Sequence, residues 1–269
     1  MRVHIISDME GISGIATPYQ ASAGRGLYEE GRRLYTEEIN AAVRGAKAAG
    51  ATEIVVMDHH GAGDGYNFNS LVPDDLDPAC EFVVQEEWTE YTGFLEEGVD
   101  AALLIGMHAR AGTPNAVMSH TVSSADWLNL WFNGTLVGET GINAAFCGAF
   151  GCPVLLVTGD GATCEEATQL LGEGLATVEV KQGLGLTSAR MLAPERAREL
   201  VEAGAKGALA NLDAVEPYDP GKPCEIKVEY KSPGPPAKLR DRAGVELLDP
   251  RTLVSRAGDW WSAWRQFFF

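Results

Sequence analysis

The sequence predicts an α/β protein with a mostly parallel central sheet flanked by helices, followed by a smaller C-terminal α+β region. Short apolar runs alternate with amphipathic helical stretches up to about residue 209, which is the rhythm of strand and crossover-helix units. Continuous apolar runs of this kind are typical of strands buried in a parallel sheet. After residue 210 the pattern changes to apolar residues that alternate with charged ones. With 269 residues, of which 45% are hydrophobic, the chain is long enough to bury a substantial core.

The elements of the α/β part follow one another in a regular order. A first strand is expected at residues 3–8, and a Gly-rich loop leads from it into a helix at residues 27–49, which stops at Gly50. The next strand is expected at residues 54–57. Further strands are expected at residues 101–105, 153–157 and 176–180, and further helices at residues 139–150, 163–171 and 194–209.

The C-terminal region has a different character. In residues 224–231 apolar side chains alternate with charged ones, which predicts an antiparallel or peripheral strand with one wet face. Pro/Gly-rich segments at residues 216–223 and 232–238 flank this strand. We therefore predict an α/β catalytic region at residues 1–210 and an α+β region at residues 211–269, although loops within one single domain explain these segments equally well.

The chain ends in a strongly aromatic segment. Residues 258–269, "GDWWSAWRQFFF", carry too much aromatic surface to leave in water. Docking onto the chain's own domain and filling of a subunit interface both satisfy this requirement, because aromatic residues are common in both settings. The two alternatives stay open at this point.

Composition excludes several classes of partner. The formal net charge of −17 should repel nucleic acid and anionic membranes. The longest apolar runs are far shorter than the roughly 20 residues that a bilayer helix needs. The first residues lack the long apolar region of a secretory signal, so a cytoplasmic location is expected. The five cysteines show no CxxC spacing, which indicates reduced thiols rather than a disulfide framework or a cysteine-built zinc site.

Carboxylates and histidines follow three of the expected strands. Asp8 and Glu10 leave the first strand in "IISDMEGISG", His60 follows the second in "VVMDHHGAGDG", and His108 follows the third in "LLIGMHARAG". The carboxyl ends of strands in an open α/β sheet meet at one edge, so these side chains should converge. Imidazole and carboxylate together suit Zn²⁺ or a similar ion, and a shared Asp8 could bridge two ions. The alternative is that the histidines are satisfied loop residues and the acids cap turns.

Glu139 is a further candidate with two interpretations. It lies between two glycines in "NGTLVGETGINA", at an expected helix start. A glutamate in a first turn ordinarily complements the helix dipole, and this interpretation stands beside a role in the metal cluster.

Five blocks in one order then identify a family. The blocks "SDMEGISG", "DHHG", "IGMHARAG…VMSHT", "NGTLVGETGINA" and "PVLLVTGD" resemble those of the zinc-dependent D-aminopeptidase family, the DppA-type metallopeptidases, over most of residues 1 to about 210. The resemblance implies zinc, two ions per subunit if one carboxylate bridges, and a ring-like homo-oligomer, a decamer, in which residues 211–269 take part. It implies that the metal ligands are Asp8, Glu10, His60, His108 and Glu139, and that the catalytic residue is His120.

Details of the blocks refine this expectation. Gly11 and Gly14 should let the backbone turn tightly round the cluster. The second block carries an additional histidine, His59, as an alternative ligand; we prefer His60 because it directly precedes the block's glycine and its neighbour should point the other way. Asp58 is a candidate for holding the ligand loop, and Asp160 either adjoins the site or caps a helix. The acidic and aromatic segment at residues 85–95 departs from the family pattern, which leaves substrate specificity open.

These observations predict a metal-dependent aminopeptidase. The expected reaction is hydrolysis of the N-terminal amide bond of short peptides or amino-acid amides, with preference for a D residue. His120 would act as a nucleophile or as a general acid–base, and the alternative is that it only holds a ligand. Rival hypotheses are another metal-dependent amidase, a metallophosphoesterase, and a non-enzymatic oligomeric metal-binding protein. Few basic residues accompany the motif blocks, which speaks against a phosphate substrate.

Overall fold

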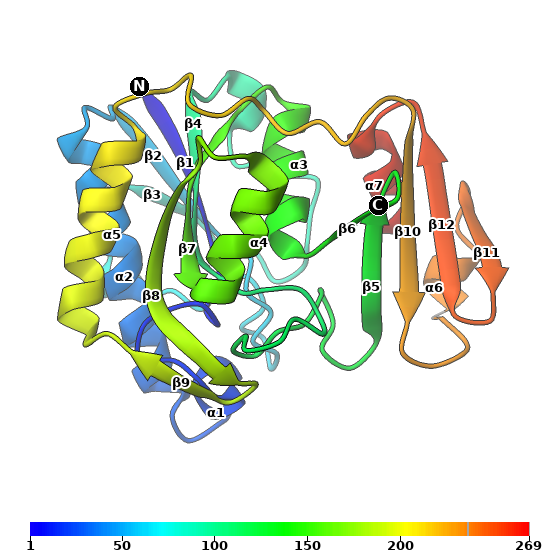
Figure 1. The fold of residues 1–269 in the computed structure, drawn as a ribbon, viewed down its shortest axis with the longest axis horizontal. Helices are drawn as coiled ribbons and strands as arrows, with labels where there is room; N and C mark the ends of the chain where they lie inside the picture. The colour runs from blue at the N-terminus through cyan, green and yellow to red at the C-terminus, as the bar shows by residue number, and fades with distance from the viewer. Residues whose placement is uncertain (236, 269) are drawn as a thin grey trace.

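The computed structural model describes residues 1–235 and 237–268, which form two sheets with helices around the larger one (Figure 1). The larger sheet has seven strands in the order β3-β2-β1-β4-β7-β8-β9. All neighbours from β3 to β8 run parallel, and β9 runs antiparallel to β8. The predicted mostly parallel central sheet is confirmed. Its strands are β1 Arg2–Ser7, β2 Glu53–Asp58, β3 Glu81–Val83, β4 Ala101–Met107, β7 Val154–Asp160, β8 Ala176–Gly185 and β9 Ser188–Met191.

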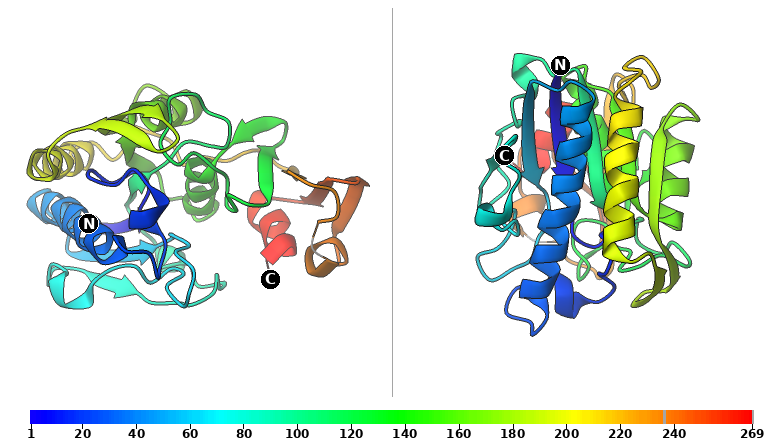
Figure 2. Two further views of the ribbon diagram at one scale, coloured as in Figure 1. Left: turned by 90° about the horizontal axis from the view of Figure 1, so that it is seen from below. Right: turned by 90° about the vertical axis from the view of Figure 1, so that its left-hand side faces the viewer.

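Helices cover both faces of this sheet. α2 (Tyr28–Ala48) and α5 (Pro194–Ala208) lie side by side on one face, while α3 (Glu139–Ala149) and α4 (Gly161–Leu171) cover the other (Figures 1 and 2). Each helix turns its apolar residues toward the sheet, as its sequence periodicity predicts. None of the described helices combines the length and the hydropathy that crossing a bilayer requires. The short helical elements are α1 Pro18–Ala21, α6 Ala237–Arg240, and the 3₁₀ turns η1 Pro73–Asp75 and η2 Leu95–Glu97.

The second sheet has five antiparallel strands in the order β11-β12-β10-β5-β6. Buried and half-buried residues alternate along β10, which confirms the predicted strand with one wet face. Two strands of this sheet come from the middle of the chain, where the sequence indicated no strands. The division into residues 1–210 and 211–269 stays a prediction. The strands are β5 Trp127–Phe132, β6 Thr135–Val137, β10 Cys224–Tyr230, β11 Val245–Asp249 and β12 Thr252–Ala257.

The aromatic C-terminal segment forms α7 (Trp260–Phe268), which packs within its own chain between α3 and the five-stranded sheet (Figure 2). Trp260, Trp264 and Phe267 are buried there. The Trp260 ring meets that of Phe132 on β5 edge-on, with 5.6 Å between the ring centroids. Docking onto the chain's own domain is therefore the correct alternative for these residues. Phe269, which the prediction included, lies outside the described residues.

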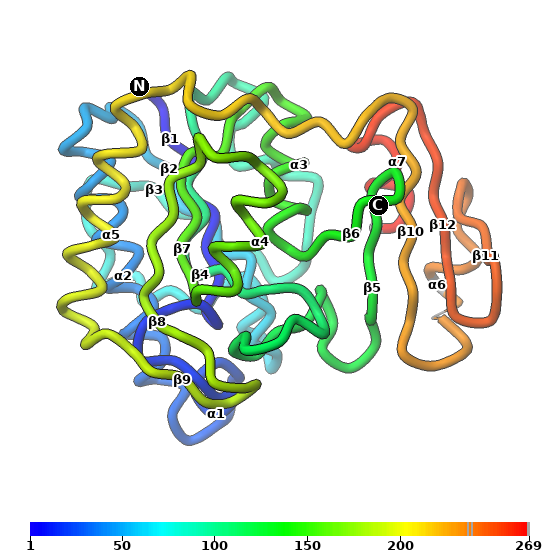
Figure 3. Tube along the Cα trace, in the orientation of Figure 1, coloured from blue at the N-terminus to red at the C-terminus, as the bar shows by residue number. Residues whose placement is uncertain are grey.

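The carboxyl ends of β1, β2, β4 and β7 meet at one edge of the larger sheet, the lower edge in Figure 1. The trace in Figure 3 shows the loops that leave these strands gathered at this edge. This edge is where the candidate site lies.

Candidate metal centre

The loop after β1 lies directly against the end of β4. The Gly11 amide donates to the carbonyl of Gly106 over 2.7 Å, and the Asp8 amide donates to the carbonyl of Ile105 over 2.9 Å. A Cβ on Gly11 would lie 2.0 Å from the Met107 carbonyl oxygen, so another residue would push the two segments apart. The predicted role of Gly11 in a tight turn is a close approach of backbones, which brings Asp8 beside the histidine that follows β4.

Two histidines and three carboxylates converge here. The Nδ1 atom of His60 lies 3.2 Å from Asp8 Oδ1 and 2.9 Å from Glu10 Oε2. The Nε2 atom of His108 lies 3.3 Å from Asp8 Oδ2 and 3.2 Å from Glu139 Oε1. Asp8 thus lies between the two rings, with one carboxylate oxygen toward each. The structure brings together all five residues expected as ligands; their role as ligands stays a prediction.

In each of these two rings, the nitrogen that faces away from the carboxylates has a hydrogen-bond partner of its own. His60 Nε2 donates to the carbonyl of Ala21 over 2.6 Å, and His108 Nδ1 donates to that of Ala109 over 3.0 Å. A carbonyl oxygen can only accept, so in the neutral ring the nitrogen that faces the carboxylates carries a lone pair. A lone pair aimed at carboxylate oxygens is repulsive unless a cation lies between them. Ring nitrogens held in this way, beside carboxylate oxygens, are the donors that zinc prefers.

The charges of the cluster lead to the same conclusion. Burial lowers the pKa values of His60 and His108, but the adjacent carboxylates outweigh it and raise both well above the ordinary value. Burial raises the pKa of Asp8, but the hydrogen bond with His60 and the charge of His108 hold it well below its usual range. Among the described residues, buried Glu10 Oε2 has no hydrogen bond of acceptable geometry. The site therefore demands positive charge, and the residues present fit a bound divalent metal.

Glu139 does more than complement a helix dipole. It is the first residue of α3, and its Oε1 accepts a hydrogen bond of 2.8 Å from the Val122 amide while facing His108. Val122 has a φ of 56°, which a β-branched side chain rarely adopts. The strained loop around Val122 is therefore held against the first turn of α3.

This loop also carries His120 into the cluster. Its ring stacks on that of His108, with centroids 4.0 Å apart and planes inclined by 13°. His120 Nδ1 donates to the Met118 carbonyl over 2.8 Å, and Nε2 lies 3.6 Å from Glu139 Oε1. Two groups each offer donor atoms within 4.8 Å of one another: Asp8, Glu10 and His108, and His108, His120 and Glu139.

His59 lines an inner cavity beside the cluster but makes its closest contacts with Asn143 and Trp88 and not with the carboxylates. Its Nδ1 lies 2.8 Å from Asn143 Oδ1, and its ring packs against that of Trp88 with centroids 4.7 Å apart. Burial lowers the pKa of His59 to about 4, so the ring is neutral at pH 7. Of the two adjacent histidines, His60 adjoins the cluster.

Two aspartates secure the loops of the site. Asp58 accepts hydrogen bonds from the His60 amide over 2.8 Å and from the hydroxyl of Tyr35 over 2.8 Å. Asp160 caps α4, because its Oδ1 accepts from the Thr163 amide over 2.8 Å. Its other oxygen accepts from the Val117 amide over 2.7 Å, so Asp160 also ties down the loop that leads to His120.

A buried lysine holds the loop after β1 from the other side. Lys181 on β8 is 2% exposed, and its Nζ donates to the carbonyls of Glu10, Ile12 and Ile15 over 2.5, 2.8 and 2.6 Å. Burial lowers the pKa of Lys181 to about 8 and raises that of nearby Glu38 on α2 to about 7. Sequence reasoning missed both residues; its one signal was a lysine placed directly after an apolar strand.

Two cavities open from the cluster. An inner one of about 100 Å³ is lined by Asp8, Glu10 and Glu139 together with the rings of Phe68 and Trp88. An outer one of about 560 Å³ shares Glu10 and His120, among others, and opens between the loops at the sheet edge. Trp88 belongs to the segment at residues 85–95, which departs from the family pattern. The aromatic content of this segment was the sequence feature that could have pointed to a residue in the cavity wall.

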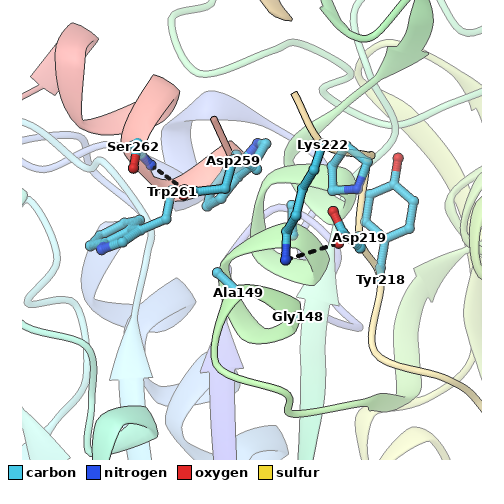
Figure 4. Close-up of a pocket in the computed structure, with 11 residues that line it drawn as sticks. Gly148, Ala149, Tyr218, Asp219, Lys222, Asp259, Trp261 and Ser262 are labelled. Carbon is cyan, nitrogen blue, oxygen red and sulfur yellow. Dashed lines mark hydrogen bonds and ion pairs between the residues drawn. The ribbon is translucent and has the colours of Figure 1, made fainter. Parts of the chain in front are cut away.

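A separate cavity of about 250 Å³ lies where α3, α7 and the segment before β10 meet (Figure 4). Lys222 there lies 3.4 Å from the carboxylate of Asp219, and Asp259 accepts from the Ser262 amide over 2.8 Å. None of its lining residues belongs to the metal cluster. Lys222 and Asp219 pair with each other and Asp259 caps the start of α7, so the chemistry is expected at the sheet edge.

An α/β sheet whose carboxyl edge holds histidines and shared carboxylates beside an open cavity defines a metal-dependent hydrolase. Comparisons with known proteins agree. The family model described as D-aminopeptidase matches residues 1–269, so the chain belongs to the D-aminopeptidase family. The D-aminopeptidase of Bacillus subtilis (strain 168) is 32% identical over 256 residues, which are 94% of this chain and 90% of that protein.

A solved structure shares the whole fold. It is that of the Zn-dependent D-aminopeptidase DppA from Bacillus subtilis, described as a self-compartmentalizing protease. The TM-score is 0.90 at 30% identity, and the match covers 99% of this chain and 95% of that chain. The fold and the family that the sequence blocks predicted are thereby confirmed.

Proposed function

We propose that this protein is a zinc-dependent aminopeptidase that hydrolyses the N-terminal amide bond of short peptides or amino-acid amides, with preference for a D residue. The observation that carries the proposal is the pair of histidines whose outer nitrogens are tied to carbonyls and whose inner nitrogens face carboxylates. Membership of the D-aminopeptidase family supports the substrate class.

Asp8 would be the shared ligand of two zinc ions. Its two oxygens face different histidines, which supports one ion with Glu10 and His60 and a second with His108 and Glu139. Three protein ligands for each ion leave positions for water and substrate, as catalytic zinc requires. Zinc in such a site supplies Lewis acidity, which polarises a carbonyl and makes water acidic enough to lose a proton near pH 7.

His120 would be the catalytic side chain. Its Nδ1 donates to the Met118 carbonyl, so Nε2 is the ring nitrogen that faces Glu139 and the cavity. Such a nitrogen can attack a scissile carbonyl or take up a proton and return it to the leaving amine. The contact with His108 keeps the imidazole in place during either step.

The assembly would be a ring-like homo-oligomer, a decamer, with residues 211–269 contributing to its contacts. The solved relative is described as self-compartmentalizing, which supports an assembly of this kind. Sedimentation equilibrium of the purified chain measures the number of subunits directly.

The activity is tested with paired D- and L-alanyl amides and dipeptides, before and after removal of metal by a chelator and again after addition of zinc. We expect turnover of the D compounds, loss of turnover on chelation and its return with zinc. Turnover that survives chelation would contradict the proposal. Zinc binding without hydrolysis of either enantiomer would favour a different amide substrate or the non-enzymatic alternative.

A further inference from the structure

The outer cavity beside the metal centre is lined by a lysine from the end of the five-stranded sheet. Glu10, His60 and His120 of the candidate centre line it, and so does Lys231, which directly follows β10. Among the described residues that line this cavity, Lys231 is the one lysine or arginine. The five-stranded sheet therefore contributes a cation to a site whose other charged groups come from the seven-stranded sheet.

The ammonium group of Lys231 is positioned and has donors to spare. Its backbone amide donates to the Asp126 carbonyl over 2.7 Å, and its Nζ donates to the Ser124 carbonyl over 2.5 Å. An ammonium has three protons, so a single carbonyl leaves two donors. In the described part of the chain this nitrogen has a hydrogen bond to the Ser124 carbonyl and no ion pair; the side chain of nearby Asp126 accepts instead from Ser123.

The acidic net charge of the chain indicates a role for the ammonium group of Lys231, which has no ion-pair partner among the described residues. The chain has a formal net charge of −17, whereas divalent ions bound at the metal cluster would offset the cluster's own carboxylates. The acidic surface of the chain would repel an anionic substrate unless a local positive charge received it. Hydroxyl groups of Ser119, Ser124 and Thr187 line the same cavity and add donors for an anion.

We propose that Lys231 binds the α-carboxylate of a short peptide whose N-terminal amide bond lies at the metal centre. This inference rests on the proposed function and deepens it. In a short peptide without acidic side chains the terminal carboxylate is the one anionic group, and an ammonium pairs with it through a charge-assisted hydrogen bond. A cavity of about 560 Å³ suits a small ligand. The preferred substrates are then free short peptides rather than amino-acid amides.

The test measures kinetics of the zinc-loaded full chain on D-alanyl-D-alanine, which has a carboxylate, and on D-alaninamide, which has none. Lys231→Met removes the charge and keeps the length of the side chain, and Lys231→Arg keeps the charge. Lys206→Met is the matched control, because it removes an equal charge from the exposed surface of α5. We expect Lys231→Met to raise KM for the dipeptide about tenfold more than KM for the amide, with kcat for the dipeptide within about twofold. Lys231→Arg should retain most of the preference for the dipeptide.

Equal changes in KM for the dipeptide and the amide, or no change for either, would overturn the carboxylate subsite. Wild-type protein that hydrolyses neither compound would instead overturn the proposed function. Calorimetric titration of both compounds would then decide the subsite by itself. Tighter binding of the dipeptide than of the amide, lost in Lys231→Met, supports the subsite, and equal binding of the two by the wild type refutes it.

Discussion

The two sheets of this protein use charge in opposite ways. At the carboxyl edge of the seven-stranded sheet, Asp8, His60 and His108 are at most 4% exposed, and each has specific partners. On the five-stranded sheet, Arg256 pairs with Glu225 over 2.7 Å in side chains that are 50% and 39% exposed. Both regions show ion pairs at short distance, but water screens the second set and not the first.

A charged residue affects stability and function most where its side chain is buried. A buried charge that loses its partner keeps the full cost of having left water, whereas an exposed one is solvated again. The buried set must therefore be kept complete, and function concentrates there. Substitution of the exposed charged residues should have little effect on stability or activity.

The largest effect is expected from Asp8→Ala. Loss of the carboxylate that faces both histidines should abolish stoichiometric zinc binding and lower kcat/KM by more than about 100-fold, since loss of groups that merely support a ligand already costs 10- to 100-fold. Metal analysis and kinetics on the D-alanyl substrates measure both. Glu246→Ala, which removes a carboxylate from exposed β11, is the matched control and should match the wild type. Full zinc content in Asp8→Ala would contradict the ligand assignment.

His120→Ala should separate chemistry from metal binding. We expect kcat to fall by roughly 10²- to 10⁴-fold, the usual worth of a positioned acid–base or nucleophilic group, with zinc content unchanged. Metal analysis on the same sample as the kinetics provides the comparison. Parallel loss of zinc and activity would instead assign His120 to the metal ligands, together with His108 and Glu139, whose donor atoms lie within 4.8 Å of its own.

Lys181→Met tests the support beneath the ligand loop. The substitution leaves three carbonyls without their donor and removes one of the two cations, Lys181 and Arg198, that act on Glu38, so the free energy of unfolding should fall by about 3–5 kcal/mol. Urea unfolding of the zinc-saturated protein measures this. Adding Glu38→Gln should recover part of the loss, because the remaining buried charge is removed. A change below about 1 kcal/mol, as expected for exposed Lys206→Met, would show that the buried ammonium is unimportant.

The smallest effect is expected from Arg256→Ala on the five-stranded sheet. Its pairs with Glu225 and Glu246 are half exposed, so kcat/KM and zinc content should match those of the wild type and Tm should move by about 2 °C at most. Thermal unfolding and kinetics measure the two. A large loss of stability would show that the contrast between the two sheets is wrong.

Much of the candidate site was predictable because it depends on local pattern. Asp8, Glu10, His60 and His108 directly follow apolar strands, and parallel strands deliver such residues to one edge. The choice of His60 over His59 follows from the motif, in which the ligand histidine directly precedes the glycine, and from the opposite directions of adjacent side chains in an extended segment.

Other features of the fold and the site could not be predicted, because they depend on contacts between segments that are far apart in the sequence. β5 and β6 were missed, although they form a local hairpin with each other; the other neighbour of β5, β10, follows about a hundred residues later, and no local pattern announces that pairing. Lys181 resembles an ordinary strand lysine until the carbonyls of the loop after β1 are seen around it.

By itself, the sequence determined the alternation of strands and helices, the family, and the residues that reach the sheet edge, because periodicity and motif order are properties of the chain. The tertiary structure alone decided that the aromatic C-terminal helix packs on its own chain and that Lys231 shares a cavity with His120. It also decided that His60, His108 and His120 each direct one ring nitrogen to a backbone carbonyl. Burial, hydrogen-bond partners and cavities arise from segments far apart in sequence, and no local pattern records them.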